Sequence, residues 1–164
     1  MNAPQAELAK ITNRDMLKGT LADAMKGADV FVGVSAPRVV TKEMVASMAE
    51  RPILFPCANP IPEITPEEAK DAGAYIVGTG SSEYPNQINN VLVFPGLFRG
   101  ALDVRAKDIN DEMMRAASIG IASCVKDDEL SVDHILPFAY DKAAHAAVAE
   151  AVSRAAIRTG VARI

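Results

Sequence analysis

Four side-chain amides gather within five positions, in the run Asn86-Gln87-Ile88-Asn89-Asn90, directly before an apolar segment. One of them is expected to cap the helix that follows, because asparagine is favoured at that place. A cap accounts for one amide but not for four. Neutral amides at a helix N-terminus suit an anionic substrate, since the helix dipole and the free N–H groups already favour negative charge. The run therefore predicts a binding site for an anion.

Two further loops carry residues suited to ligand binding. In Asn59-Pro60-Ile61-Pro62 the first proline favours extended backbone at Asn59 and so holds its amide at a defined angle. Such an amide can donate to a carboxylate or ribose oxygen and accept from a carboxamide, although an Asx-turn explains the pattern equally well. In Ser35-Ala36-Pro37 the small side chains let a ligand approach the backbone, but an ordinary turn is the commoner meaning of that spacing.

Other reactive residues have weaker support. His134 and His145 have no partner motif, so structural or surface roles are expected. Cys57 and Cys124 lie far apart, without neighbours at metal-ligand spacing, which argues against a disulfide scaffold or a zinc site. The G-x-G-x-x-G fingerprint and the zinc-protease and serine-hydrolase motifs do not occur. The spacing therefore assigns no catalytic residue and no metal ligand.

Alternating strand and helix patterns place these loops. Three apolar runs predict buried strands at residues 30–34, 52–55 and 74–78, the first of them covered on both faces. A short helix over 19–26 ends at Gly27, and a second over 42–49 begins at the N-cap Thr41. A third begins at the capping box of Thr65 and Glu68 and ends at Gly73.

The second half of the sequence predicts helices only. Asn89 or Asn90 caps a segment that runs to about residue 103. Asp108 or Asn110 begins the next helix, and a last helix extends from about residue 142 to 159 before Gly160. One face of the middle helix is predicted to carry Met113, Ala117, Ile121 and Cys124.

The order of elements defines the fold class. Three strands separated by helices predict a βαβαβ unit with right-handed crossovers, over about residues 19–80. This is half of a doubly wound, Rossmann-like parallel sheet in an α/β protein, and helices follow it over about 89–164. Ligands bind such sheets at the carboxyl ends of the strands, where the three loops lie. Since sheets usually have about four to six strands, we expect something else to complete this one.

Composition excludes several classes of protein. The 164 residues are 49% hydrophobic, which is too apolar for disorder, and the net charge of −4 argues against a nucleic-acid or polybasic membrane surface. No apolar run approaches the roughly 20 residues that cross a bilayer, and the first residues do not resemble a secretory signal. A cytoplasmic location is therefore expected.

The loops described above resemble those of the malic enzymes of bacterial type. The segment Cys57-Ala58-Asn59-Pro60-Ile61-Pro62-Glu63-Ile64 is similar to their A-N-P-x-P-E-I signature. Residues 84–96 are similar to their Y-P-N-Q-x-N-N-x-x-x-F-P-G signature. Residues 21–37 resemble the stretch that ends in their cofactor loop, and the last helix also resembles theirs. The resemblance covers nearly the whole chain, and its motifs are long and specific.

The resemblance implies oxidative decarboxylation of L-malate to pyruvate and carbon dioxide, with reduction of NAD or NADP and with bound Mg²⁺ or Mn²⁺. It implies that Ser35 and Ala36 line the cofactor site and that Asn59 lies between cofactor and substrate. Asn89 and Asn90 would hold malate through its carboxylate and hydroxyl oxygens. Residues 1–164 would then be part of an NAD(P)-binding domain.

The same resemblance implies that essential parts lie outside this sequence. In malic enzymes the catalytic Tyr and Lys, the acidic metal ligands and the Gly-rich pyrophosphate loop lie upstream of the matched segment. We therefore expect the chain to be inactive alone, to need the remainder of the enzyme, and to assemble as a homo-oligomer. The alternative is a non-catalytic nucleotide-binding or assembly module that needs a partner chain, because an exposed apolar sheet edge favours association.

Two positions depart from the family pattern. Arg38 follows Ser35-Ala36-Pro37 where the family often has glycine. Residues 80–83 read Gly-Ser-Ser-Glu where the family often has G-R-S-D, so a basic side chain near the cofactor loop is missing. The preference between NAD and NADP therefore stays open.

Overall fold

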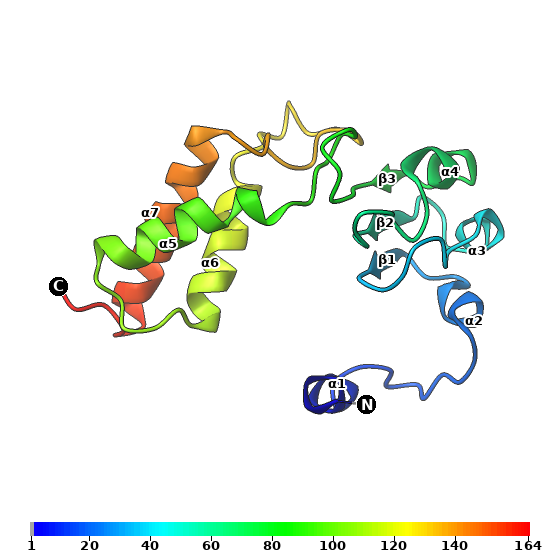
Figure 1. The fold of residues 1–164 in the computed structure, drawn as a ribbon, viewed down its shortest axis with the longest axis horizontal. Helices are drawn as coiled ribbons and strands as arrows, with labels where there is room; N and C mark the ends of the chain where they lie inside the picture. Colours follow the sequence, from blue (N-terminus) through cyan, green and yellow to red (C-terminus); the bar gives the residue numbers. More distant parts are fainter. Residues whose placement is uncertain (1) are drawn as a thin grey trace.

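The computed structural model describes residues 2–164, which form a sheet body and a helical bundle (Figure 1). After the N-terminal helix α1 (Ala3–Ala9), the sheet body contains α2 (Leu21–Met25), β1 (Val30–Gly33), α3 (Lys42–Ala46), β2 (Ile53–Pro56), α4 (Pro66–Asp71) and β3 (Ile76–Val77). The helical bundle contains the 3-10 helix η1 (Asn90–Leu92), α5 (Phe94–Asp103), α6 (Asp111–Ala122) and α7 (Lys142–Arg158). Each part has its own hydrophobic core.

The sheet has three parallel strands in the order β1-β2-β3, which confirms the predicted fold class. Val30 is opposite Ile53 and Leu54 is opposite Val77, so all three strands end at the same edge. Leu54 lies at the centre of the core and is completely buried. Helices α2, α3 and α4 all lie on one side of the sheet (Figure 1).

The prediction that the first strand is covered on both faces is wrong. Val30 and Val32 of β1 are 50% and 64% exposed, whereas Gly33 is buried. Successive side chains of a strand point to opposite faces, and the helices of the sheet body cover only one face. The apolar run therefore correctly indicated a strand with two apolar faces. In the structure, helices of this chain cover only one of those faces.

Two of the three predicted helices of the sheet body begin where the sequence places them, whereas α2 begins at Leu21, two residues later than predicted. Thr41 caps α3, and the hydroxyl of Thr65 and the carboxylate of Glu68 form the predicted capping box of α4. Helix α3 ends at Ala46, three residues earlier than predicted. Gly73 follows α4 with φ +102°, a left-handed conformation that glycine adopts without steric cost.

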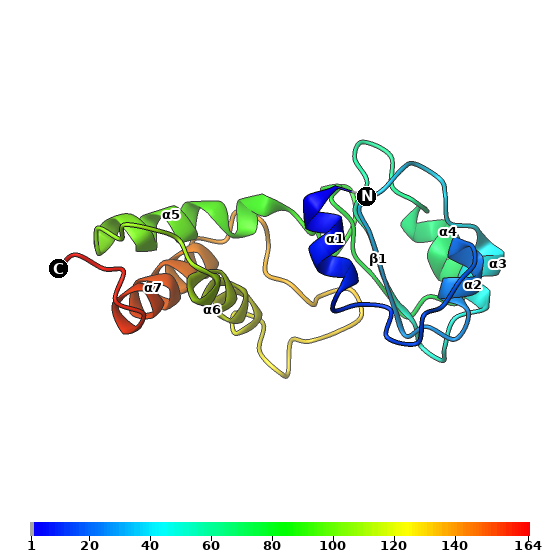
Figure 2. The ribbon, with the colours of Figure 1, turned by 90° about the horizontal axis from the view of Figure 1, so that it is seen from below.

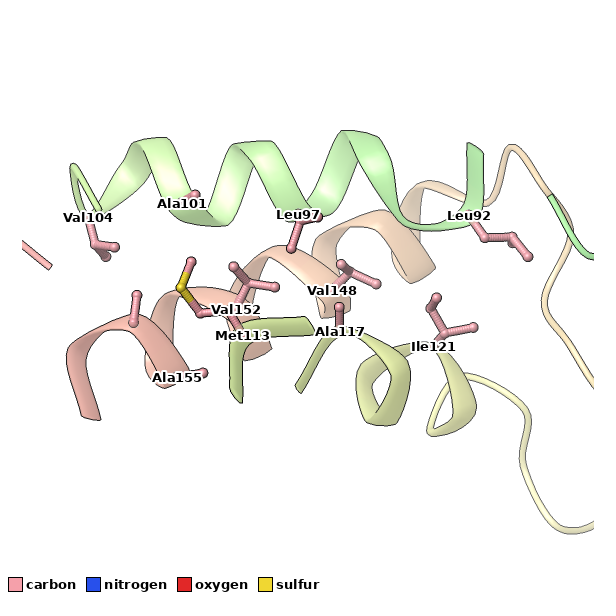
Figure 3. Close-up of a cluster of buried hydrophobic side chains, with 11 residues drawn as sticks. Leu92, Leu97, Ala101, Val104, Met113, Ala117, Ile121, Val148, Val152 and Ala155 are labelled. Atoms are coloured by element: carbon pink, nitrogen blue, oxygen red, sulfur yellow. The ribbon is translucent and has the colours of Figure 1, made fainter. Parts of the chain in front are cut away.

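The bundle packs α5 and α6 against α7 around a shared apolar core (Figure 3). Gly96 allows α5 to approach α7 closely, because a Cβ there would lie 2.5 Å from the carbonyl oxygen of His145. Gly100 makes a second close approach one turn later, and its carbonyl oxygen accepts a 2.9 Å hydrogen bond from Ser153. Met113 of α6 is completely buried against both partners.

Two details of the bundle differ from the sequence prediction. The segment over 89–103 is interrupted at Val93, which separates η1 from α5, and Asn89 is the residue that caps η1. Asn110 caps α6, but Cys124 lies beyond the last residue of that helix and outside the core. No helix among residues 2–164 is both long and apolar enough to cross a membrane.

The segment of residues 123–141, here called the connecting segment, joins α6 to α7. Its path leaves the bundle, reaches the sheet body near β3 and returns (Figures 1 and 2). Lys70 of α4 holds it through a 2.7 Å ion pair with Asp133. The connecting segment thus brings residues from late in the sequence to the carboxyl end of the sheet.

Candidate functional site

A cavity of about 440 Å³ lies at the carboxyl ends of β2 and β3. Asn59 lines it from the loop after β2, and Asn89 lines it from the loop before the bundle. The remaining lining residues are Ala58, Pro60, Pro62, Thr79, Gly80, Ser81, Ser82, Gln87 and Tyr140. None of these described residues carries a charge, so the cavity offers amides, hydroxyls and backbone groups to a ligand.

The wall after β3 is built by backbone hydrogen bonds around Thr79. The N–H of Ile88 donates to the Thr79 carbonyl oxygen at 2.7 Å, and the buried Thr79 hydroxyl accepts from the N–H of Ser81 at 3.0 Å. These bonds fold residues 79–89 back on themselves and bring Gln87 to the cavity. The amide-rich run therefore lies beside the end of β3 and runs parallel to it.

Asn89 serves two functions that the sequence left as alternatives. Its Oδ1 accepts a 3.0 Å hydrogen bond from the N–H of Val91 and so caps η1. The same half-buried side chain lines the cavity, where its Nδ2 group remains available as a donor. The helix cap and the cavity lining thus share one residue, and the cap orients its amide.

Asn86 is a structural residue of the same run. Its buried Nδ2 donates to the carbonyl oxygens of Val77 at 3.1 Å and Val132 at 2.8 Å, and its Oδ1 accepts from the N–H of Ile135 at 2.9 Å. With φ +58°, it occupies a left-handed conformation that asparagine tolerates better than most residues. Asn86 therefore ties the connecting segment to the end of β3.

Glu63 is the residue that the motif analysis missed. It is completely buried, and its Oε1 accepts hydrogen bonds from the N–H of Ser35 at 2.7 Å and from the hydroxyl of Ser35 at 3.0 Å. Its Oε2 accepts from the N–H of Ala58 at 3.0 Å. One carboxylate thus joins the loops that follow β1 and β2. Its place in the A-N-P-x-P-E-I signature is the signal that could have identified it.

The hydrogen bonds around Glu63 keep it ionised. Burial by itself would raise the pKa of this carboxyl, because it disfavours the charged form. Backbone donors from Ala58 and Ser35, together with the Ser35 hydroxyl, outweigh burial and hold the pKa below its ordinary value. The site therefore contains a fixed negative charge beneath its surface, and that charge positions loops without lining the cavity.

The structure does not bring every predicted site residue into this cavity. Ser35 and Ala36 lie exposed on the neighbouring loop after β1, outside the lining, and Asn90 is exposed beyond Asn89. The hydrogen bonds of Ser35 to Glu63 hold its loop beside the one that carries Asn59. Their assignment to cofactor and malate remains a prediction.

The surroundings of His145 and Cys57 indicate structural roles. The Nε2 atom of His145 lies 3.1 Å from the Val91 carbonyl oxygen and 3.2 Å from that of Ala139. Burial, followed by the charge of Glu63, raises the pKa of the Cys57 thiol, so the unreactive protonated form is favoured.

Residues 2–164 contain no cluster of three or more His, Cys, Asp and Glu side chains able to hold a metal ion. Mg²⁺ prefers several oxygen ligands, usually including carboxylates, and the described lining of the cavity has no carboxylate. Within residues 2–164, the side chains therefore do not fit a resident Mg²⁺ or Mn²⁺ ion.

The fold and the cavity define a class of protein. A parallel sheet with a loop-lined cavity at its carboxyl edge is the architecture of Rossmann-like nucleotide-binding domains. Within that class, the family model described as "Malic enzyme, NAD binding domain" matches residues 3–157. The chain therefore belongs to the malic enzyme family.

Curated relatives carry the same family name. The chain is 58% identical over 164 residues to the bifunctional malic/malolactic enzyme of Bacillus subtilis. The match covers 100% of this chain and 40% of that protein. It is 55% identical to the NAD-dependent malic enzyme of Geobacillus stearothermophilus, over 96% of this chain and 33% of the relative. An NADP-dependent malic enzyme of Rhizobium meliloti is 48% identical, and the match covers 88% of this chain and 21% of that protein. The chain thus spans at most two fifths of these relatives.

Solved malic enzymes have the same fold. The structure of the enzyme from Pyrococcus horikoshii superposes with a TM-score of 0.86 at 49% identity, over 92% of this chain and 35% of that one. The Entamoeba histolytica enzyme superposes with a TM-score of 0.88 at 45% identity, and the match covers 93% of this chain and 32% of that one.

Proposed function

We propose that this chain is part of the NAD(P)-binding domain of a malic enzyme. In the complete enzyme it would take part in the oxidative decarboxylation of L-malate to pyruvate and carbon dioxide, with reduction of NAD or NADP. The observation that carries the proposal is the meeting of Asn59 and Asn89 in one uncharged cavity. These residues come from two different signatures and lie 30 positions apart in the sequence, and membership of the family supports the same function.

The residues of the cavity suit binding and orientation of the reactants. Primary amides donate and accept at once, so Asn59 can pair with the carboxamide of a nicotinamide ring. The free Nδ2 donor of Asn89 can bind a carboxylate or hydroxyl oxygen of malate. Malate oxidation also needs a group that accepts the hydroxyl proton. The uncharged lining offers no such base, so we propose that the remainder of the enzyme supplies it, together with the metal site.

Amide substitutions test the proposal in the longest natural protein that contains this chain. Asn59→Ala should lower kcat/KM for malate by about 10- to 100-fold, because a bound polar group loses its partner. Asn89→Asp keeps the oxygen that caps η1 and removes the donor, so a similar loss with unchanged thermal stability is expected. The resemblance also assigns Asn90 to malate. Asn90→Ala therefore tests this exposed amide against the cavity-lining amide of Asn89. Wild-type kinetics in all three variants would refute the site.

The proposal also implies that the isolated 164 residues do not oxidise malate. Formation of reduced nicotinamide would be followed with L-malate, Mn²⁺ and either NAD or NADP, for this chain and for the longest natural protein. Activity in the longer protein only is the expected result. Activity of the short chain would show that its own residues supply the base and the metal site.

A second candidate, an assembly module without catalysis, is favoured by the exposed strand β1. Val30, Val32 and the following Val34 are 50%, 64% and 83% exposed, and such a strand can pair with another chain. Light scattering during size-exclusion chromatography would detect association, and Val32→Lys should abolish it. If the chain associates, and neither it nor the longest natural protein oxidises malate, the assembly module is favoured over the malic enzyme. The homo-oligomeric state of the complete enzyme is tested by the same measurement.

A further inference from the structure

One residue of the cavity comes from a part of the chain that carries no recognised signature. Tyr140 lies in the connecting segment, 51 positions after Asn89, and lines the cavity beside the loops from β2 and β3. Its side chain is 84% exposed, so no protein group covers the ring. An aromatic ring with an uncovered face at the mouth of a polar cavity is available for contact with a ligand.

The connecting segment holds Tyr140 in place from the sheet side. Asn86 accepts from the N–H of Ile135 and donates to the carbonyl oxygen of Val132, and the ion pair of Lys70 with Asp133 adds a further attachment. These contacts fix the stretch that precedes the tyrosine to the end of β3.

The bundle holds the other side of Tyr140. The N–H of Asp141 donates to the Phe138 carbonyl oxygen at 2.9 Å, which closes a turn around residues 139 and 140. The Asp141 carboxylate caps α7 by accepting from the N–H of Ala143 at 2.8 Å, and His145 contacts the Ala139 carbonyl oxygen. The backbone at Tyr140 is thus anchored before and after, while its ring stays free.

The chemistry of the lining indicates which part of a dinucleotide this ring meets. Arg and Lys are the side chains that commonly bind phosphate groups, whereas the lining residues of this cavity are all uncharged. Amides such as Asn59 and Gln87 match a carboxamide, which donates and accepts in the same way. A flat conjugated ring bearing a carboxamide therefore fits the cavity better than a pyrophosphate does.

We propose that Tyr140 is a positioning residue whose ring packs against the nicotinamide ring of the dinucleotide and holds it beside Asn59 and Asn89. The inference rests on the proposed function and adds to it a residue outside the signatures. Because the contact uses the face of the ring, the aromatic ring matters and the phenol hydroxyl does not. Aromatic pairs prefer offset or edge-to-face contacts and add to the binding free energy beyond simple burial.

Three variants of the longest natural protein separate these effects. Tyr140→Ala should raise the KM for NAD or NADP by about 3- to 10-fold, as expected for loss of one aromatic contact. The KM for malate should change less than about twofold, and Tyr140→Phe should behave as the wild type. Phe138→Ala is the matched control, because Phe138 is 79% exposed on the same turn but lines a different cavity. It should leave both KM values unchanged.

Direct binding decides the matter independently of catalysis. Calorimetric titration with NAD and with NADP should show weaker binding to Tyr140→Ala than to the wild type and to Tyr140→Phe. Equal affinity of Tyr140→Ala and the wild type would overturn the inference, as would an equal loss in Phe138→Ala. If Asn59→Ala loses activity while Tyr140→Ala does not, the proposed function stands and this inference fails. If the wild type binds neither dinucleotide, both fail.

Discussion

The carboxylate of Glu63 occupies the space in which a side chain at position 33 would lie. A Cβ atom on Gly33 would be 2.5 Å from Cδ of Glu63 and 2.6 Å from its Oε1. The carboxylate cannot move aside without losing its hydrogen bonds to Ser35 and Ala58. The absence of a side chain at the end of β1 is therefore what allows one buried charge to join the loops that follow β1 and β2.

Gly33→Ala is expected to destabilise the protein by about 1–3 kcal/mol, the usual cost of overpacking a filled site. Chemical denaturation would measure the loss. Gly80→Ala is the matched control, because a Cβ at Gly80 meets nothing closer than 3.8 Å. Equal stability of the two variants would show that the loops adjust freely around Glu63.

Glu63→Gln should cost about 1–3 kcal/mol at pH 7, because the amide nitrogen cannot accept from the Ala58 N–H. The folded-state pKa of Glu63 is lowered, so its contribution is present above the unfolded-state pKa and is lost as the pH falls through the folded-state pKa. The difference between the wild type and the variant should therefore begin to shrink as the pH approaches 4.5, the ordinary pKa of a glutamic acid, and should shrink further at lower pH. Denaturation curves across that range would show it. The exposed Glu50→Gln variant should follow the wild type throughout, and a constant difference for Glu63→Gln would contradict the ionised state.

Substitution of Asn86 tests the attachment of the connecting segment. Asn86→Ala should lose about 2–3 kcal/mol, since it leaves the N–H of Ile135 and two carbonyl oxygens without their partner. Asn86→Gly removes the same hydrogen bonds but adopts the positive φ freely, so it should be less destabilising than the alanine variant. Hydrogen exchange at Ile135 should accelerate in both variants. Unchanged exchange there would show that the attachment does not depend on Asn86.

The backbone conformation of Arg38 suits the glycine that the resemblance to malic enzymes implies at this position. Its φ is +56°, a left-handed conformation that costs a residue with a Cβ about 1–2 kcal/mol. Arg38→Gly should therefore raise the free energy of unfolding by up to about 1 kcal/mol, after the greater freedom of the unfolded glycine is subtracted. Arg38→Ala keeps the strain and loses the same exposed ion pair with Glu68 (3.8 Å), so it is the matched comparison. A glycine variant no more stable than the alanine variant would argue against backbone strain.

The sequence predicted what depends on neighbouring residues. The caps at Thr41 and Thr65 and the stop at Gly73 follow from hydrogen bonds over three or four positions, and the structure has them. The exposure of Val32 could not be predicted in the same way. An apolar strand indicates that both faces are apolar, but whether helices cover both depends on where distant elements pack.

The amide run shows the same limit within one motif. Asn86 and Asn89 are the same residue type three positions apart, yet the first is a buried attachment and the second lines the cavity. Local sequence cannot distinguish them, because two of the three partners of Asn86, Val132 and Ile135, lie more than 40 positions away. Glu63 was missed for a related reason. Its role depends on hydrogen bonds from Ser35, which lies 28 positions earlier in the loop after β1.

The sequence by itself determined the alternation of strands and helices, their caps and the signatures that place the chain in its family. Those properties depend on residue order and on contacts within a few positions. Only the tertiary structure decided which residues share the cavity. Parallel strands end at one edge, and this brings Asn59 to Thr79 and Asn89. Tyr140 joins them because hydrogen bonds and an ion pair fold the connecting segment back onto the sheet.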